Sequence, residues 1–259
     1  MYATNYLENA VLNAMRGITF NSPGTVYVGL FLSNPTETGS AGTEVSYKGY
    51  ARQPISFSEP ALSGVNMSIR NTEQVTFPES DQNAGSVTYI GIMDSLVGGN
   101  MLAYGSLTEE MVINSGYAPV ILAGEAEFYL AGAAANSFKT KILNIFRGVA
   151  LAGFTPYFAL FNGNPESGGA ELEGSNYARL LLTLSAPAQS DSGQAYVTNT
   201  KAVNFNRPSA AWGTYGYAAI YNAASAGETV WIQAISPSVE IKKGYMPMIA
   251  AGAVRVAIN

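Results

Sequence analysis

The sequence predicts a mainly β protein made of two tandem homologous β-sandwich domains, jelly-roll-like or Ig-like, each opened by one short N-terminal α-helix. Three observations support this prediction. The second half of the chain repeats the first half in order, short aromatic and β-branched runs are separated by Gly, Pro, Asn and Ser, and each half has only one segment with helical spacing. Because no long helices alternate with the strands, a parallel α/β sheet is not expected.

The repeat follows from residues that recur in the same order along both halves. Each copy is about 130 residues long, the usual size of one domain. We therefore predict domains at residues 1–130 and 131–259, joined in the small-residue stretch 131–135, and we expect each domain to bury its own core. The matched positions include Arg16-Gly17 with Arg147-Gly148, Asn34-Pro35 with Asn164-Pro165, Asn71 with Asn199, Tyr89 with Tyr217, and Gly116-Tyr117 with Gly244-Tyr245.

Helical spacing occurs once, at the start of each copy. Apolar residues recur at i, i+4, i+7 and i+8 from Leu7, and again from Phe138. Asn5 with Glu8 three residues later resembles a capping box, and a glycine follows each segment where a left-handed residue would end a helix. One short helix therefore opens each domain.

The rest of each copy is predicted to form strands. Their spacing and the turn residues between them are typical of a sandwich or a barrel. The expected strands are residues 25–32, 86–93 and 101–104 in the first copy and residues 156–161, 229–234 and 254–258 in the second.

Composition excludes several classes of function. Hydrophobic residues make up 47% of the chain, which is enough for a core, but charged residues make up only 12%, against roughly 25% in a typical soluble domain. Such a surface is suited to burial against copies of the chain or against partners. The absence of His and Cys removes thiolate metal sites, Ser-His-Asp catalysis and disulfides. We expect no catalytic residues, no cofactor and no metal.

Charge and hydropathy also limit the partners. No basic tract follows the pattern of a nucleic-acid site, and no window reaches the ~18 apolar residues of a membrane span, so neither nucleic acid nor a membrane is an expected partner. The N-terminal residues do not resemble an export signal, which predicts that the chain stays in the cytosol of the cell that makes it.

A Glu and an Arg recur with the same separation in both copies. They are Glu44 with Arg52 and Glu171 with Arg179. A functional interpretation makes each pair a clamp for a carboxylate or phosphate, because the guanidinium offers a bidentate fork. The structural interpretation, which we favour, is that each pair fastens a loop to the sheet, because the pair is kept while the loop residues differ.

Two further groups of residues have a functional and a structural interpretation. Trp212 and Trp231 could stack on sugars, although aromatic residues in strands more often belong to a core or a subunit interface. The adjacent Glu109 and Glu110 suggest glycosidase or calcium chemistry. Neighbouring strand residues point to opposite faces and the second copy has Pro237 and Ser238 there, so a solvated segment is favoured.

Charge differs between the copies. Residues 1–130 hold 4 basic and 12 acidic side chains, whereas residues 131–259 hold 9 basic and 6 acidic side chains. Opposite charges allow neighbouring chains to join head to tail. We therefore expect a homo-oligomer, with a ring of three chains and six quasi-equivalent domains as the favoured form.

The order of several short motifs carries a resemblance. Val26 to Phe31, Asn34-Pro35, Gly49 to Arg52 and Tyr89 to Ile92 follow one another in the first copy. This succession resembles the small β-rich virion proteins of tailed bacteriophages, commonly labelled tail fibre or head decoration proteins. The second copy departs from the pattern, for example with Asn176 at the position of Gly49. The resemblance implies a non-catalytic structural component of the virion, repeated by symmetry.

The position on the particle is a separate expectation. A fibre usually needs a shaft of coiled coil, collagen-like or repetitive β sequence, and the chain has none. We therefore expect a capsid decoration or cement protein that contacts the major capsid protein and its own copies. The alternative is a tail, baseplate or fibre component, either an adaptor or a glycan-binding or receptor-binding module. An enzyme ranks last.

Overall fold

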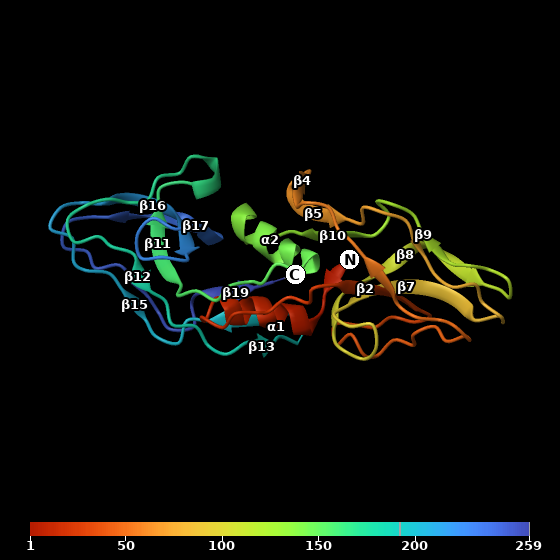
Figure 1. Ribbon diagram of the computed structural model, residues 1–259. Coiled ribbons are helices and arrows are strands. Elements are labelled where there is room, and N and C mark those ends of the chain that lie inside the picture. The colour runs from red at the N-terminus through yellow and green to blue at the C-terminus, as the bar shows by residue number, and fades with distance from the viewer. Residues whose placement is uncertain (192, 259) are drawn as a thin grey trace.

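The computed structural model describes residues 1–191 and 193–258 and is mainly β (Figure 1). Two groups of strands lie at opposite ends of an elongated molecule, and both α-helices lie between them, near both ends of the chain. This arrangement confirms the predicted fold class, because each half is a layered, antiparallel β structure opened by a single helix.

The first half begins with a short strand and a helix. Its elements are β1 (Tyr2–Ala3), α1 (Asn5–Ala14), β2 (Val26–Phe31), β3 (Gln53–Ile55), β4 (Ala61–Ser63), β5 (Asn66–Arg70), β6 (Val75–Thr76), β7 (Gly85–Met93), β8 (Met101–Ile113), β9 (Val120–Ile121) and β10 (Glu127–Leu130).

The second half repeats this order, except that a single bridge between Ala134 and Trp231 stands in the place of β1. Its elements are α2 (Asn136–Leu143), the 3-10 helix η1 (Asn144–Arg147), β11 (Tyr157–Phe161), the 3-10 helix η2 (Pro165–Ser167), β12 (Leu180–Leu181), β13 (Ala188–Gln189), β14 (Ala195–Thr198), β15 (Val203–Asn204), β16 (Gly213–Tyr221), β17 (Thr229–Ile241), β18 (Met248–Ile249) and β19 (Arg255–Ala257).

The sheets of the two halves correspond strand by strand. The large sheet has the order β1-β8-β7-β2-β3 in the first half and β17-β16-β11-β12 in the second. A three-stranded sheet, β10-β5-β4 or β19-β14-β13, and a two-stranded sheet, β6-β9 or β15-β18, complete each half. The long hairpins β7–β8 and β16–β17 even share a register shift at equivalent places, next to Val87 and Tyr215.

The helices begin and end close to the predicted positions. Gly17 and Gly148 have φ angles of 86° and 80°, so both lie in the left-handed region that ends a helix. The capping-box interpretation is wrong, because Asn5 is the first residue of α1 and no side chain caps that terminus. The Glu8 carboxylate instead accepts a hydrogen bond from the backbone N of Ala195 in the other half, at 2.8 Å.

Two equivalent strands, β8 and β17, are longer than predicted. We expected residues 101–104 and 229–234, whereas β8 and β17 each extend to 13 residues. Many of the added residues are exposed. On the outer edge, β8 is paired only by the short β1, and β17 only by the bridge from Ala134, and the added residues lie beyond these partners. An exposed edge lacks the apolar alternation from which a strand is recognised.

Each helix packs against the other half of the molecule. Helix α1 contacts β8 of its own half and β14 of the second half, and α2 contacts β17 of its own half and both β5 and β10 of the first half. Phe146, just after α2, lies with its ring centroid 4.8 Å from that of Phe128 and 5.8 Å from that of Phe57. Each helix is therefore shared by both halves, which amounts to an exchange of helix contacts across the junction.

The exchange follows an approximate two-fold axis. Phe20 and Leu151 occupy equivalent positions in the two halves, and they form an antiparallel bridge in which each backbone N donates to the other's carbonyl oxygen, at 2.9 and 3.0 Å. A contact between identical positions is the mark of an isologous interface. The chain is thus arranged like a symmetric dimer whose two subunits are covalently joined.

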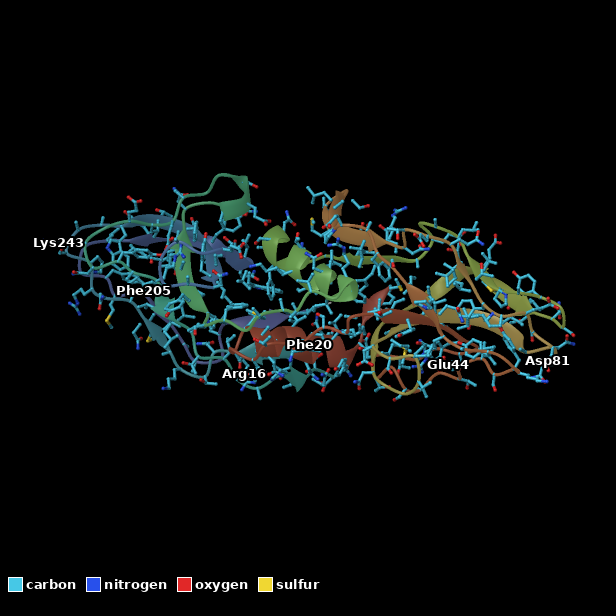
Figure 2. All side chains as sticks on the ribbon, viewed as in Figure 1. Arg16, Phe20, Glu44, Asp81, Phe205 and Lys243 are labelled. Atoms are coloured by element: carbon cyan, nitrogen blue, oxygen red, sulfur yellow. The ribbon has the colours of Figure 1, made fainter. Side chains whose placement is uncertain are left out.

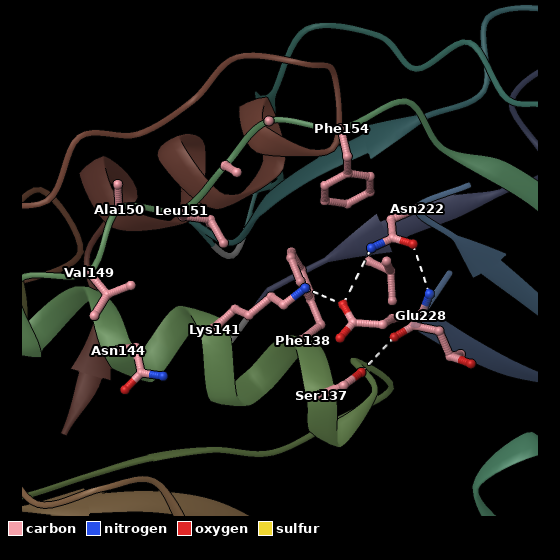
Figure 3. A pocket seen from close by; sticks show the side chains of 14 residues that line it. Ser137, Phe138, Lys141, Asn144, Val149, Ala150, Leu151, Phe154, Asn222 and Glu228 are labelled. Carbon is pink, nitrogen blue, oxygen red and sulfur yellow. Dashed lines mark hydrogen bonds and ion pairs between the residues drawn. The ribbon is translucent and has the colours of Figure 1, made fainter. Parts of the chain in front are cut away.

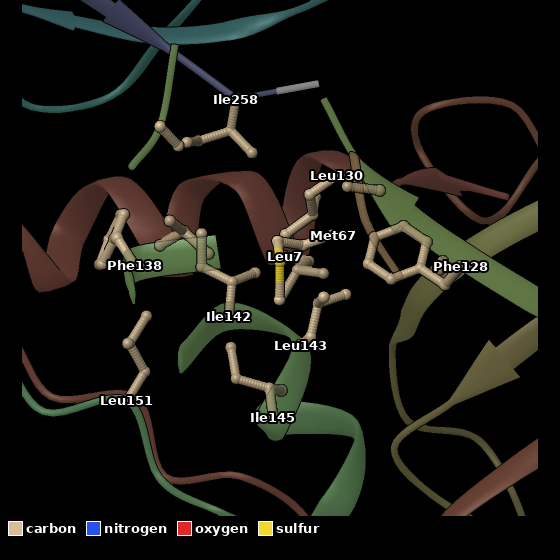
Figure 4. Close-up of a cluster of buried hydrophobic side chains, with 14 of the residues drawn as sticks. Leu7, Met67, Phe128, Leu130, Phe138, Ile142, Leu143, Ile145, Leu151 and Ile258 are labelled. Atoms are coloured by element: carbon tan, nitrogen blue, oxygen red, sulfur yellow. The ribbon is translucent and has the colours of Figure 1, made fainter. Parts of the chain in front are cut away.

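The hydrophobic core runs through this junction. Figure 4 shows side chains of both helices meeting those of β5 and β10 in one cluster. Leu7, Ile142, Leu143 and Phe128 are all almost fully buried there. The boundaries 1–130 and 131–259 stay a prediction, but the core of each half includes a helix from the other half.

Candidate functional site

The repeated Glu and Arg residues form a buried network in the first half. The carboxylate of Glu44 receives Arg52 Nε at 2.9 Å and Nη2 at 2.8 Å, and it also accepts the Tyr50 hydroxyl hydrogen at 3.1 Å. Arg52 Nη1 donates to the carbonyl oxygens of Ser95 and Gly98 in the β7–β8 turn, at 3.0 and 2.6 Å. One ion pair thus ties the segment around Glu44 to that turn.

The second half repeats the network. Arg179 Nη2 lies 2.8 Å from Glu171 Oε2, and Arg179 Nη1 donates to the carbonyl oxygens of Ala223 and Ala226, at 3.3 and 2.6 Å. Tyr177 occupies the place of Tyr50, and burial first, then the neighbouring carboxylate, raises the pKa of both hydroxyls above their usual value. The guanidinium groups of Arg52 and Arg179 both donate to acceptors within the chain. This geometry favours the structural interpretation over a clamp for an external ligand.

We expect Arg52→Ala to lower the free energy of unfolding by about 3 kcal/mol, because it leaves the mostly buried Glu44 carboxylate without its cation. Chemical denaturation at neutral pH measures the change. Arg70→Ala is the matched control, since its ion pair with Glu127 is more exposed and its loss is expected to cost less than about 1 kcal/mol. Equal costs for both variants would contradict the loop-fastening role.

The two tryptophans lie in the core of the second half. Trp212 is 5% exposed, contacts the rings of Tyr177 and Phe205, and donates its Nε1 hydrogen to the carbonyl oxygen of Ser175 at 3.0 Å. Trp231 is 9% exposed in β17. Trp231 also lines an apolar depression of the second half, whereas Trp212 is enclosed by its neighbours. The low exposure of both indoles favours the core interpretation, which stays a prediction.

Glu109 and Glu110 lie on the exposed outer edge of the large sheet. They belong to β8 beyond the part of that strand that pairs with β1, and the equivalent positions of β17 are Pro237 and Ser238. Charges and prolines on an edge strand both prevent pairing with another chain. The pair therefore has a structural account as protection of an edge, with different residues in the two halves.

A pocket of about 260 Å³ lies between α2, residues 149–154 and the β16–β17 turn (Figure 3). The Lys141 ammonium pairs with Glu228, whose carboxylate also accepts Asn222 Nδ2 at 3.3 Å. In the equivalent place of the first half, the Tyr6 ring lies edge-on to the ring of Phe20, with centroids 5.9 Å apart. The charged groups of the pocket bind each other across the helix and the turn, as expected for a structural contact.

A second depression, of about 500 Å³, lies between β17 and β19 and is lined mainly by apolar residues. In the first half the Met1 side chain occupies the equivalent position, where a Cβ atom on Gly105 would lie 2.7 Å from Met1 Cγ. Gly132 takes the place of Met1 in the second half, and a Cβ atom there would meet nothing within 4 Å. The two halves therefore differ in whether a side chain covers this part of the sheet, although Gly132 itself lines a neighbouring pocket.

Sequence reasoning missed a buried charge at equivalent positions of the two helices. Glu8 in α1 and Lys139 in α2 are 2% and 4% exposed. Burial raises the pKa of Glu8 to about 7, although the hydrogen bond from Ala195 N opposes the shift and nearby Glu37 adds to it. Burial also lowers the pKa of Lys139. Glu8 lies four and seven residues before Leu12 and Met15, on the apolar face of the helix. This spacing is the feature of the sequence that indicates burial of Glu8.

Glu8 is expected to make stability fall with rising pH. A carboxyl group whose pKa rises from its ordinary 4.5 to about 7 on folding stabilises the protein below pH 4.5, and this contribution is lost as the pH passes 7. The wild-type unfolding free energy is expected to fall between pH 4.5 and 8 by on the order of 3 kcal/mol through Glu8, and we expect Glu8→Gln to remove this pH dependence.

Urea denaturation at several pH values measures the effect of Glu8→Gln. Glu73→Gln, at an exposed position, is the control and is expected to keep the slope of the wild-type protein. An unchanged slope in Glu8→Gln would show that Glu8 titrates normally.

The part of the chain that the structure describes holds neither a cluster of metal ligands nor a membrane-spanning helix. No group of three or more Asp or Glu residues within this part of the chain is arranged to hold a metal ion. No helix among the same residues is long and apolar enough to cross a membrane.

The duplicated architecture matches a known family. A family model described as "Podophage GP4 fiber I protein gp80" matches residues 2–128 and again residues 133–257. The chain belongs to this family. The two matches divide the sequence close to the predicted junction, so a family member is present twice in one chain. No curated protein matches the chain.

Membership of this phage fibre family has direct consequences. It confirms the resemblance to tailed-phage virion proteins and the tandem duplication. The protein is a structural phage protein of the fibre type, and the family implies that it is a component of the virion.

Proposed function

We propose that the protein is a globular module of the phage fibre or of its attachment site, where it holds other virion proteins through surface contacts and performs no catalysis. The match of a phage fibre family to both halves is the observation that carries this proposal. The geometry is in agreement, because the Arg52 and Arg179 forks and the charged pocket groups are bound to internal partners.

Its partners in this proposal are tail or baseplate proteins and further copies of the chain. The low charged fraction of the surface supports contacts of this kind, since charge depletion is typical of the centre of protein interfaces. Nucleic acid and membranes are not among the proposed partners. A glycan or receptor would have to be bound by exposed tyrosines such as Tyr117 and Tyr245, because both tryptophans are buried.

Capsid decoration is the second candidate, and the observation that favours it is the pair of layered β-rich halves with a surface poor in charge. In that case the main partner is the major capsid protein. The two candidates differ in copy number, because a capsid lattice offers far more equivalent positions than a tail.

The test is to count copies of this protein per virion by quantitative gel and to place it by immunogold labelling. A small copy number with gold on the tail or on fibres, and intact heads after deletion of the gene, is the result expected for a fibre module. Labelling over the whole capsid, with fragile heads after deletion, would overturn the fibre proposal and establish decoration. Absence of the protein from purified virions would contradict both.

A further inference from the structure

The two ends of the long axis are built from equivalent loops. At the end of the first half, Gly116 N donates to Ser80 O at 2.7 Å, and at the end of the second half Gly244 N donates to Pro208 O at 2.9 Å. Figure 2 shows Asp81 and Lys243, which belong to these loops, at opposite extremes of the molecule. The same local fold therefore faces outward at both ends.

The charges on these equivalent loops are reversed. Glu79 and Asp81 are exposed at the first end, and Arg207 and Lys243 are exposed at the second. Glu79 and Arg207 occupy matching positions of the repeat, so a carboxylate at one end corresponds to a guanidinium at the other. Neighbouring charges reduce the contrast without removing it, and these are Lys48 near Asp81, Glu173 near the Arg207 loop, and Glu240, which pairs with Lys242.

Exposed apolar side chains accompany the charges. Tyr117 at the first end and its counterpart Tyr245 at the second are both exposed, and the second end adds Met246 and Met248. Tyrosine and methionine are enriched in the buried centres of protein interfaces. Each end thus combines an apolar surface with charges of one predominant sign.

We propose that copies of this chain bind one another end to end, with the Glu79 end of one copy against the Arg207 end of the next. The two surfaces differ and lie at opposite extremes of the molecule. A complex of two copies therefore still has one free acidic end and one free basic end. A contact of this type is heterologous, and it builds an open row when the rotation between successive copies does not close a ring. The position of the two surfaces at opposite extremes of an elongated molecule favours a row over a ring of three chains.

This inference goes beyond the proposed function, because it concerns contacts between copies wherever the protein lies in the virion. Charge pairs at the rim of such a contact steer association and fix its orientation. The association is therefore expected to weaken as salt rises from about 20 mM to about 500 mM, where the Debye length is only a few ångströms.

The test exchanges charges between equivalent positions, so that each substitution installs a residue that the fold already carries in its other half. Glu79→Arg with Ser115→Lys makes both ends basic, and Arg207→Glu with Lys243→Ser makes the second end resemble the acidic end. Glu73→Lys and Lys201→Glu are the controls, because they change the charge in the same directions outside the end loops, by two units where the end variants change it by three.

Sedimentation velocity at about 20 mM salt measures the association of the purified chain. We expect elongated multimers of the wild-type protein and of both controls, an affinity about tenfold or more lower for each end variant alone, and recovery of association when the two end variants are mixed. A monomeric wild-type protein at high concentration, or end variants that associate as the wild type does, would overturn the proposal. These results are independent of the location of the protein in the virion.

Discussion

Residues 1–130 expressed alone are not expected to form a stable folded monomer. In the intact chain, the sheet β10-β5-β4 is covered by α2 and Phe146, which belong to the second half. Removal of residues 131–259 is expected to expose Met67, Ile69, Phe128 and Leu130. In the intact chain each of these side chains is at most 6% exposed. Each exposed side chain loses on the order of 1.5–3 kcal/mol of burial free energy. The sum over the four is comparable with the whole free energy of unfolding of a domain.

The measurement is circular dichroism with size-exclusion chromatography of the isolated half and of the two halves produced together. We expect the isolated half to be unfolded, aggregated or self-associated, and the co-produced halves to form a folded one-to-one complex. The control is the full chain cleaved at a protease site inserted between the exposed Ala131 and Gly132, because Ala134 and Ala135 are buried and pair with β17; here the fold is expected to persist. A monomeric, cooperatively unfolding 1–130 fragment would show that each half buries a sufficient core by itself.

Phe146→Ala is expected to destabilise the protein by about 3–5 kcal/mol, the usual cost of truncating a buried aromatic ring. Phe146 is 2% exposed, and the rings of Phe57 and Phe128 in the first half lie against it. The resulting cavity lies at the junction of the halves. A residue of the second half is therefore expected to stabilise the strands of the first.

Hydrogen exchange of the backbone amides in β5 and β10 tests this effect, together with urea denaturation. We expect faster exchange in these first-half strands in Phe146→Ala. Phe161→Ala is the matched control, because Phe161 stacks on Tyr221 within a separate cluster of the second half. Exchange confined to the second half in both variants would contradict the coupling of the halves through α2.

Local features of the fold were predictable because they depend on residues close together in the sequence. The helix ends follow from Gly17 and Gly148, and the central strands follow from aromatic and β-branched runs. The Glu44–Arg52 contact was predictable for a different reason. A pair kept at the same separation in two copies of one fold has the same surroundings twice, and both copies form the ion pair.

The outer parts of β8 and β17 and the state of Glu8 were not predictable in the same way. β8 and β17 carry Glu109, Glu110 and Pro237, which are unfavourable in strands and are tolerated there because they lie at the register shifts, where β7 and β16 do not pair with them. Glu8 was assigned to a helix cap because capping needs only local spacing. Its actual partner, Ala195, is far away in the sequence and in the other half.

The sequence alone determined that this protein is a duplicated, mainly β chain with one helix per copy, because repetition and periodicity are properties of residue order. Only the tertiary structure decided that the copies exchange helix contacts about a two-fold axis and present oppositely charged ends. An apolar helix face has the same pattern whichever sheet it covers. The choice between its own sheet and the neighbouring one depends on the path of the chain through residues 131–135 and on packing across the junction.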